Sequence, residues 1–138
     1  MIGIDTNVLV RYFAQDDAPQ SAQATHIIED VLSPKNRGFI SSIVLCELVW
    51  VLKRVYKQSK GELVQAIEKL LDTNGFEIEH RQCAVYAVYD YSHGSADFSD
   101  YYLAEIGCVA GCTKTVTFDA HAAEHPLFES VSSFLNKE

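Results

Sequence analysis

The segment MIGIDTNVLV (residues 1–10) sets the pattern on which the fold depends. Its apolar run from Ile2 to Ile4 is typical of a short, buried parallel strand. Asp5, Thr6 and Asn7 follow at once, and all three residue types favour the N-terminus of a helix. The segment therefore predicts a strand that passes directly into a helix, which is the basic unit of an α/β fold.

The same alternation continues along the chain. Further strands are expected at residues 37–41, 76–79, 115–118 and 130–131. A second helix is expected to contain Pro19 in its first turn and to reach residue 32, and later helices are expected at residues 43–56, 60–72, 81–91 and 100–109. Alternating strands and helices form crossover units and hence parallel sheets. We therefore expect a three-layer α/β/α sandwich with a mainly parallel central sheet, in a single domain spanning residues 1–138.

Composition limits the functional classes. The 138 residues are 48% apolar and 22% charged, which is typical of a packed globular domain. The longest apolar stretch, residues 43–52, is broken by Glu47 and is too short to cross a bilayer. No secretion signal is recognisable, so we expect a cytoplasmic protein without membrane contact. The net charge of −8 argues against a module that binds nucleic acid by bulk attraction, but it permits an enzyme that meets nucleic acid at a local metal site.

The cysteines invite a zinc interpretation, which the spacing disfavours. Cys108 and Cys112 precede His121 and His125, but only eight residues separate Cys112 from His121, whereas a zinc finger has about twelve. That spacer also contains a strand-like apolar segment. We therefore expect reduced thiols that are mostly buried in the core, at Cys46, Cys83, Cys108 and Cys112.

Three acidic residues lie where parallel strands end and helices begin. Asp5 and Asp119 directly follow predicted strands, and Asp100 opens a helix one residue after Ser99, its predicted cap. Ligands of such sheets bind beyond the carboxyl ends of the strands. Taken singly, each acid is also explained as a helix cap. Together they predict a carboxylate cluster at one sheet edge.

Glu47 is the fourth acid, in a helix that is apolar on every side of it. An ionised carboxylate in such surroundings costs several kcal/mol unless it is paired, protonated or bound to metal. Lys53 and Arg54 lie six and seven residues away, which is a poor reach for an ion pair. Four carboxylates that converge repel one another, and a hard cation such as Mg²⁺ or Mn²⁺ relieves that repulsion. Without a Walker loop or a Cys or Ser nucleophile with its base, metal-assisted phosphodiester hydrolysis is the remaining chemistry.

Four segments in this order resemble the PIN domain, and more narrowly the VapC-type toxins of bacterial and archaeal toxin–antitoxin pairs. They are IDTNVLV (residues 4–10), the apolar helix that carries Glu47, DFSDYYLA (residues 97–104) and TFD (residues 117–119). The resemblance extends from residue 2 to about residue 131. It implies a PIN-like fold and a metal-dependent endoribonuclease that hydrolyses RNA, forms a homodimer and is inhibited by a cognate antitoxin protein.

The resemblance also implies roles for individual residues. Catalytic metal ligands are expected at Asp5, Glu47, Asp100 and Asp119, with Asp97 as an additional ligand. One or two Mg²⁺ (or Mn²⁺) ions are expected there. Polar residues expected to line the site are Thr6, Asn7 and Thr117. Candidate phosphate contacts are Arg11, Lys53, Arg54 and Lys57, although a solvated helix face explains these four equally well.

Other functions remain open at this point. A similar metal site also suits a nuclease that acts on DNA or in RNA processing. A non-catalytic PIN-like binding module predicts damaged carboxylates, whereas all four are present. A phosphohydrolase or receiver domain with Asp5 as nucleophile is disfavoured, because Asn7 stands where a second Asp is needed and Lys114 precedes its strand.

Overall fold

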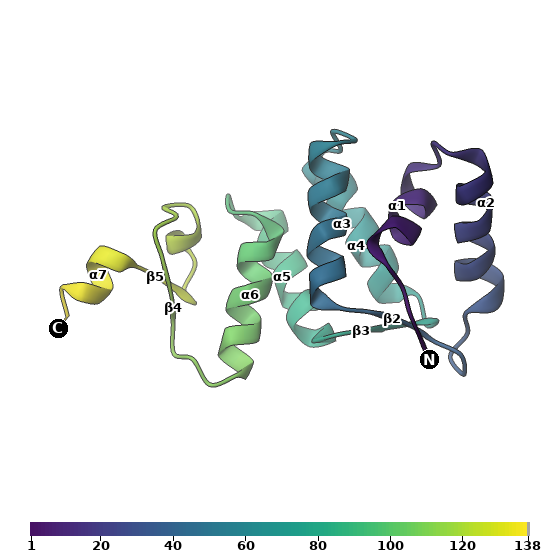
Figure 1. Ribbon diagram of the computed structural model, residues 1–138. Coiled ribbons are helices and arrows are strands. Elements are labelled where there is room, and N and C mark those ends of the chain that lie inside the picture. The colour runs from purple at the N-terminus through teal and green to yellow at the C-terminus, as the bar shows by residue number, and fades with distance from the viewer. Residues whose placement is uncertain (138) are drawn as a thin grey trace. The chain divides into compact units, whose positions relative to one another are not determined.

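Three short parallel strands form the first sheet of the computed structural model, which describes residues 1–137. They are β1 (Ile2–Gly3), β2 (Gly38–Ile40) and β3 (Phe76–Ile78), in the spatial order β1-β2-β3. Figure 1 labels β2 and β3 near the lower ends of the neighbouring helices. Ile2 pairs with Gly38, which in turn pairs with Phe76. The packing at Gly38 is close: a Cβ atom there would lie 2.8 Å from Leu32 Cδ1 and 2.9 Å from Ile4 Cγ1, so a larger residue would displace these side chains.

Helices connect these strands in the first of two compact units, Met1–Arg81. They are α1 (Thr6–Ala14), α2 (Ala18–His26), a π-helical segment (Ile27–Val31), α3 (Ser42–Arg54) and α4 (Lys60–Asp72). The four α-helices begin at polar caps, Asp5, Asp17, Ser41 and Ser59, whose side chains accept backbone N–H groups. Their apolar faces bury a core of aliphatic side chains that includes Leu9, Ile40, Leu48, Leu52 and Ile67.

The second unit begins at Gln82. It contains most of α5 (Arg81–His93), then α6 (Phe98–Val109), β4 (Thr115–Thr117), a 3₁₀ turn (Ala122–Glu124), β5 (Phe128–Ser130) and α7 (Val131–Leu135). Strands β4 and β5 pair in parallel, with Thr115 opposite Phe128. The interior is aromatic: Phe98 is buried and its ring lies 5.4 Å from that of Tyr102 and 6.2 Å from that of Tyr91.

The structure confirms the predicted mixed α/β fold with parallel strands. Strand β1, which the sequence predicts to be buried, is exposed instead. Strand β4 is partly buried. Ile2 is 58% exposed because β1 lies at a sheet edge, and Phe118, just after β4, is 92% exposed.

The cysteines also differ from the expectation. Cys83 is buried and Cys46 is half-buried, whereas Cys108 and Cys112 are exposed. They lie at the end of α6 and in the turn after it, where the chain leaves the core. None of the helices described in residues 1–137 combines the length and the apolar character needed to cross a bilayer.

Candidate functional site

Thr6 links two of the predicted carboxylates in the first unit. Asp5 follows β1 and caps α1, because its Oδ1 atom accepts the backbone N–H of Thr6 at 2.8 Å. The Thr6 hydroxyl donates to Oε1 of Glu47 at 3.2 Å. Glu47 lies on α3, the helix that follows β2, and β2 is the strand that pairs with β1. The structure therefore brings Asp5, Thr6 and Glu47 together, although the two acids are far apart in the sequence.

The surroundings of Glu47 are more open than predicted. Helix α3 buries one face, formed by Leu45, Leu48, Val49 and Leu52. Glu47 is exposed on another face, which it shares with the exposed side chains of Ile43 and Trp50. The expectation that apolar side chains enclose Glu47 is therefore wrong, and burial gives no argument for a cation at this carboxylate.

The second unit groups three further predicted carboxylates. Asp97 is the N-cap of α6 and forms a capping box with Asp100, whose Oδ2 atom accepts the backbone N–H of Asp97 at 3.1 Å. The predicted cap, Ser99, is instead inside the helix, because the helix begins at the buried Phe98. Asp119 lies just after β4, and its Oδ1 atom accepts the backbone N–H groups of the next turn, at 2.8 Å and 3.1 Å.

Asp100 is a carboxylic acid of this group whose pKa is shifted. Burial raises the pKa of its carboxyl above the ordinary value, and the negative charges of Asp97 and Asp119 raise it further. The hydrogen bond from the Asp97 backbone acts in the opposite direction. Repulsion among three neighbouring carboxylates is relieved by a divalent cation, and carboxylate oxygens are the ligands that Mg²⁺ and Mn²⁺ prefer. The three carboxylates are therefore of the chemical type that the expected ion binds, although within residues 1–137 their oxygens do not all lie within 4.8 Å of one another, as the ligand atoms of a formed site would.

The predicted polar residues have identifiable positions. Thr117 supports Asp119, because its Oγ1 atom accepts the Asp119 backbone N–H at 2.9 Å. Asn7 is exposed and lines a cavity between α1 and α2. Arg11 is held on the protein surface, with its guanidinium 3.2 Å from the carboxylate of Asp16 and 2.7 Å from the amide oxygen of Gln20.

The other candidate phosphate contacts lie at the end of α3. Lys53 and Arg54 are exposed in its last turn. Lys57 is exposed shortly after it and has a left-handed backbone conformation, with φ of 56°. Basic side chains at this position also complement the negative end of the helix dipole. Their role in phosphate binding stays a prediction.

A comparison with protein families identifies a domain that covers most of the chain. The family model described as the PIN domain matches residues 2–126. The chain belongs to the PIN domain family. PIN domains are generally nucleases that use divalent metal ions, and the matched residues of this PIN domain include all five predicted acidic ligands. Among curated proteins, none matches the chain significantly.

This PIN domain also contains a cluster that sequence reasoning missed. Within the described residues, the one group of three potential metal ligands is Asp90 on α5, Glu105 on α6 and His125, whose ligand atoms lie within 4.8 Å of one another. His125 Nε2 lies 3.0 Å from Oδ2 of Asp90, and the backbone N–H of Leu127 donates to His125 Nδ1 at 3.1 Å. The proton of the neutral ring is therefore on Nε2, which donates to Asp90.

The hydrogen bonds of His125 differ from those of a typical metal-binding histidine. A histidine that binds metal through one ring nitrogen usually donates a proton from the other nitrogen to an acceptor. In His125 the other nitrogen already accepts a hydrogen bond. No short sequence motif predicts this cluster, because its three members come from three separate segments. The geometry favours a structural hydrogen-bond network over a metal centre.

Glu105→Gln is expected to stabilise the protein in a pH-dependent way. Burial, the charge of Asp90 and a hydrogen bond to Asp90 raise the pKa of Glu105. A raised pKa in the folded state means that the stability from this group is complete at pH 4 and is lost as pH rises through the raised value. The variant should therefore match the parent at pH 4 and exceed it at pH 8 by about 0.5–1 kcal/mol, since Glu105 is partly exposed and screened.

Urea unfolding at several pH values measures this difference. Glu68→Gln, at an exposed position on α4, is the matched control and should change stability little at any pH. A Glu105→Gln variant that is less stable than the parent at pH 8 contradicts the prediction, because the ionised carboxylate would then be stabilising.

Proposed function

We propose that this PIN domain is a metal-dependent endoribonuclease, with Asp5, Glu47, Asp100 and Asp119 as catalytic residues and Asp97 as a further metal ligand. The observation that carries the proposal is the set of acidic residues within the PIN match, four of which lie at strand ends or helix starts: Asp5, Asp97, Asp100 and Asp119. The grouping of Asp97, Asp100 and Asp119, with the raised pKa of Asp100, supports it.

The chemistry follows from the oxygen donors. When bound, Mg²⁺ or Mn²⁺ lowers the pKa of a coordinated water and offsets negative charge on the scissile phosphate. Thr6 orients two of the carboxylates by donating its backbone N–H to Asp5 and its hydroxyl to Glu47. Thr117 holds the backbone of Asp119 in place. These contacts fix the acids before substrate binds, which limits the reorganisation needed during the reaction.

The biological setting is proposed on the resemblance to VapC-type toxins. In that setting the protein is cytoplasmic, forms a homodimer and is inhibited by a cognate antitoxin protein. The net charge of −8 supports a narrow RNA target, because an acidic surface gives little general attraction to a phosphate backbone. A DNA substrate is the alternative that the first experiment also examines.

The proposal is tested by incubating the purified protein with structured RNA in Mn²⁺ or Mg²⁺, and with single-stranded DNA of the same sequence. We expect cuts in RNA that require the metal, leave 5′-phosphate ends and disappear in EDTA. Asp100→Asn should abolish them, whereas Asp90→Asn, in the separate network with His125, should retain them. Cleavage of DNA alone contradicts the RNA assignment. Absence of both cleavage and calorimetric metal binding contradicts the enzyme assignment and favours a binding module.

A further inference from the structure

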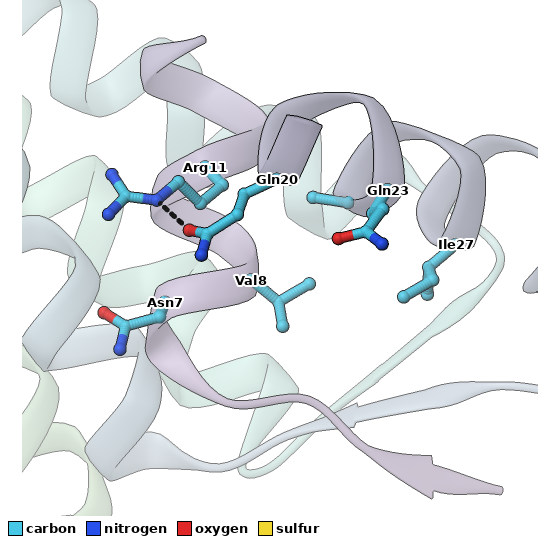
Figure 2. Close-up of a pocket in the computed structure, with 7 residues that line it drawn as sticks. Asn7, Val8, Arg11, Gln20, Gln23 and Ile27 are labelled. Carbon is cyan, nitrogen blue, oxygen red and sulfur yellow. Dashed lines mark hydrogen bonds between the residues drawn. The ribbon is translucent and has the colours of Figure 1, made fainter. Parts of the chain in front are cut away.

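A cavity of about 280 Å³ lies between α1 and the helical segment that runs from α2 into residues 27–31 (Figure 2). All the residues that line it belong to the first unit, and they occupy successive turns of the two helical segments. They are Asn7, Val8, Arg11, Gln20, Gln23, Ala24 and Ile27. The cavity begins at Asn7 in the first turn of α1, the helix that Asp5 caps.

The cavity combines apolar walls with a polar rim. Val8 and Ile27 point toward one another from the two sides (Figure 2), and Ala24 adds a small apolar surface. Asn7, Gln20 and Gln23 supply three carboxamide groups. Apolar walls suit the faces of a flat ring, and amides suit its edge, which carries both donors and acceptors.

The charge of the cavity argues against an anion. Its one cationic side chain, Arg11, is 3.2 Å from the carboxylate of Asp16, which also accepts the hydroxyl of Tyr56 at 2.7 Å. A phosphate at Arg11 would therefore meet a carboxylate that is already in place. A neutral ligand avoids this repulsion.

The amides have free hydrogen-bonding capacity. Gln20 uses its oxygen to accept the Nε–H of Arg11 at 2.7 Å (Figure 2), which leaves its NH₂ group as the available donor. Within residues 1–137, the side-chain amides of Asn7 and Gln23 make no hydrogen bond. The amides of Asn7 and Gln23 can therefore each pair with a base edge through one donor and one acceptor.

We propose that this cavity binds a nucleobase of the single-stranded part of the substrate, with a preference for adenine. The proposal rests on the proposed nuclease function. Asn and Gln amides pair in bidentate fashion with adenine, whereas guanine is typically read by Arg or Lys. Arg11 is already engaged by Asp16 and Gln20, so the amides decide the preference. A volume of about 280 Å³ accommodates a purine.

The test measures binding without cleavage. The full chain carrying Asp100→Asn is titrated, in EDTA, into fluorescein-labelled RNA hexamers of sequence UUAUUU or UUUUUU. We expect UUAUUU to bind about fivefold to tenfold more tightly. Adding Gln23→Leu should bring the ratio of the two dissociation constants close to one, since it removes an amide at an exposed position. Gln65→Leu, exposed on α4 outside the cavity, is the matched control and should keep the preference.

The outcomes separate this proposal from the nuclease assignment. Equal binding of the two hexamers, or a preference that survives Gln23→Leu, overturns adenine recognition in the cavity even if the parent chain cleaves RNA. A preference for UUAUUU that Gln23→Leu removes supports the site, and it does so independently of the cleavage assay. Far-UV circular dichroism of each variant confirms that the fold is retained.

Discussion

The Asp5→Asn variant is expected to lose roughly 10³-fold in RNA cleavage while its free energy of unfolding stays unchanged. Asn is as good an N-cap as Asp, so the hydrogen bond from the Thr6 backbone at 2.8 Å is retained and α1 keeps its start. The substitution removes the negative charge and one carboxylate oxygen, which a divalent cation needs. Cleavage rates in Mn²⁺ and urea unfolding in EDTA measure the two effects separately.

Two further variants distinguish the loss of a metal ligand from the loss of a helix cap. Asp5→Ala removes the cap as well as the charge, so it should lose about 1 kcal/mol of stability in addition to cleavage. Asp72→Asn, at an exposed position at the end of α4, removes one negative charge elsewhere and should leave both properties unchanged. If Asp5→Asn cleaves RNA like the parent while Asp5→Ala is only less stable, then Asp5 is a helix cap and no metal ligand.

Local signals predicted the helix starts well. Asp5, which the sequence predicts at the start of a helix, is the N-cap of α1 in the structure. The start of α6 was placed too late, because Ser99 is a good cap type whereas the structure uses Asp97 and buries Phe98 in the first turn. The competing caps differ by only two positions, and the burial of an aromatic side chain decides between them.

The periodicity of apolar residues does not predict which face of α3 is buried. Apolar residues surround Glu47 in the sequence, so every face of this helix is a plausible core face. The position of α3 after β2 selects the face with Leu45 and Leu48, and Glu47 is left exposed. The identity of Glu47 as a candidate ligand therefore depends on the PIN resemblance and on its contact with Thr6, and burial does not contribute.

Contacts between distant segments account for what was missed. Asp90, Glu105 and His125 meet only after α5, α6 and the 3₁₀ turn have packed, and no fixed spacing links them. The cavity near Asn7 likewise requires α2 to lie beside α1. Short motifs predict which residue types begin a helix or follow a strand, but such groupings depend on tertiary packing.

Phe98→Ala is expected to destabilise the protein by about 3–5 kcal/mol and to weaken cleavage at the same time. Phe98 is 1% exposed and packs between Tyr91 and Tyr102, so truncation leaves a cavity in a small aromatic core. The loss is a large fraction of the total stability of a typical domain. Phe98 is also the first residue of α6, directly after Asp97 and two residues before Asp100, so loosening it disturbs the capping box that positions both carboxylates.

Urea unfolding followed by far-UV circular dichroism measures the stability change. Phe134→Ala on α7 is the matched control: this phenylalanine is 42% exposed, and its truncation should cost less than about 1 kcal/mol. Cleavage is then compared in the absence of urea, at a temperature at which both variants are fully folded. A Phe98→Ala variant that loses under about 1.5 kcal/mol would contradict the packed aromatic core. Full cleavage by a destabilised but folded variant would mean that Asp97 and Asp100 keep their positions without the ring, because the capping box alone then holds the start of α6.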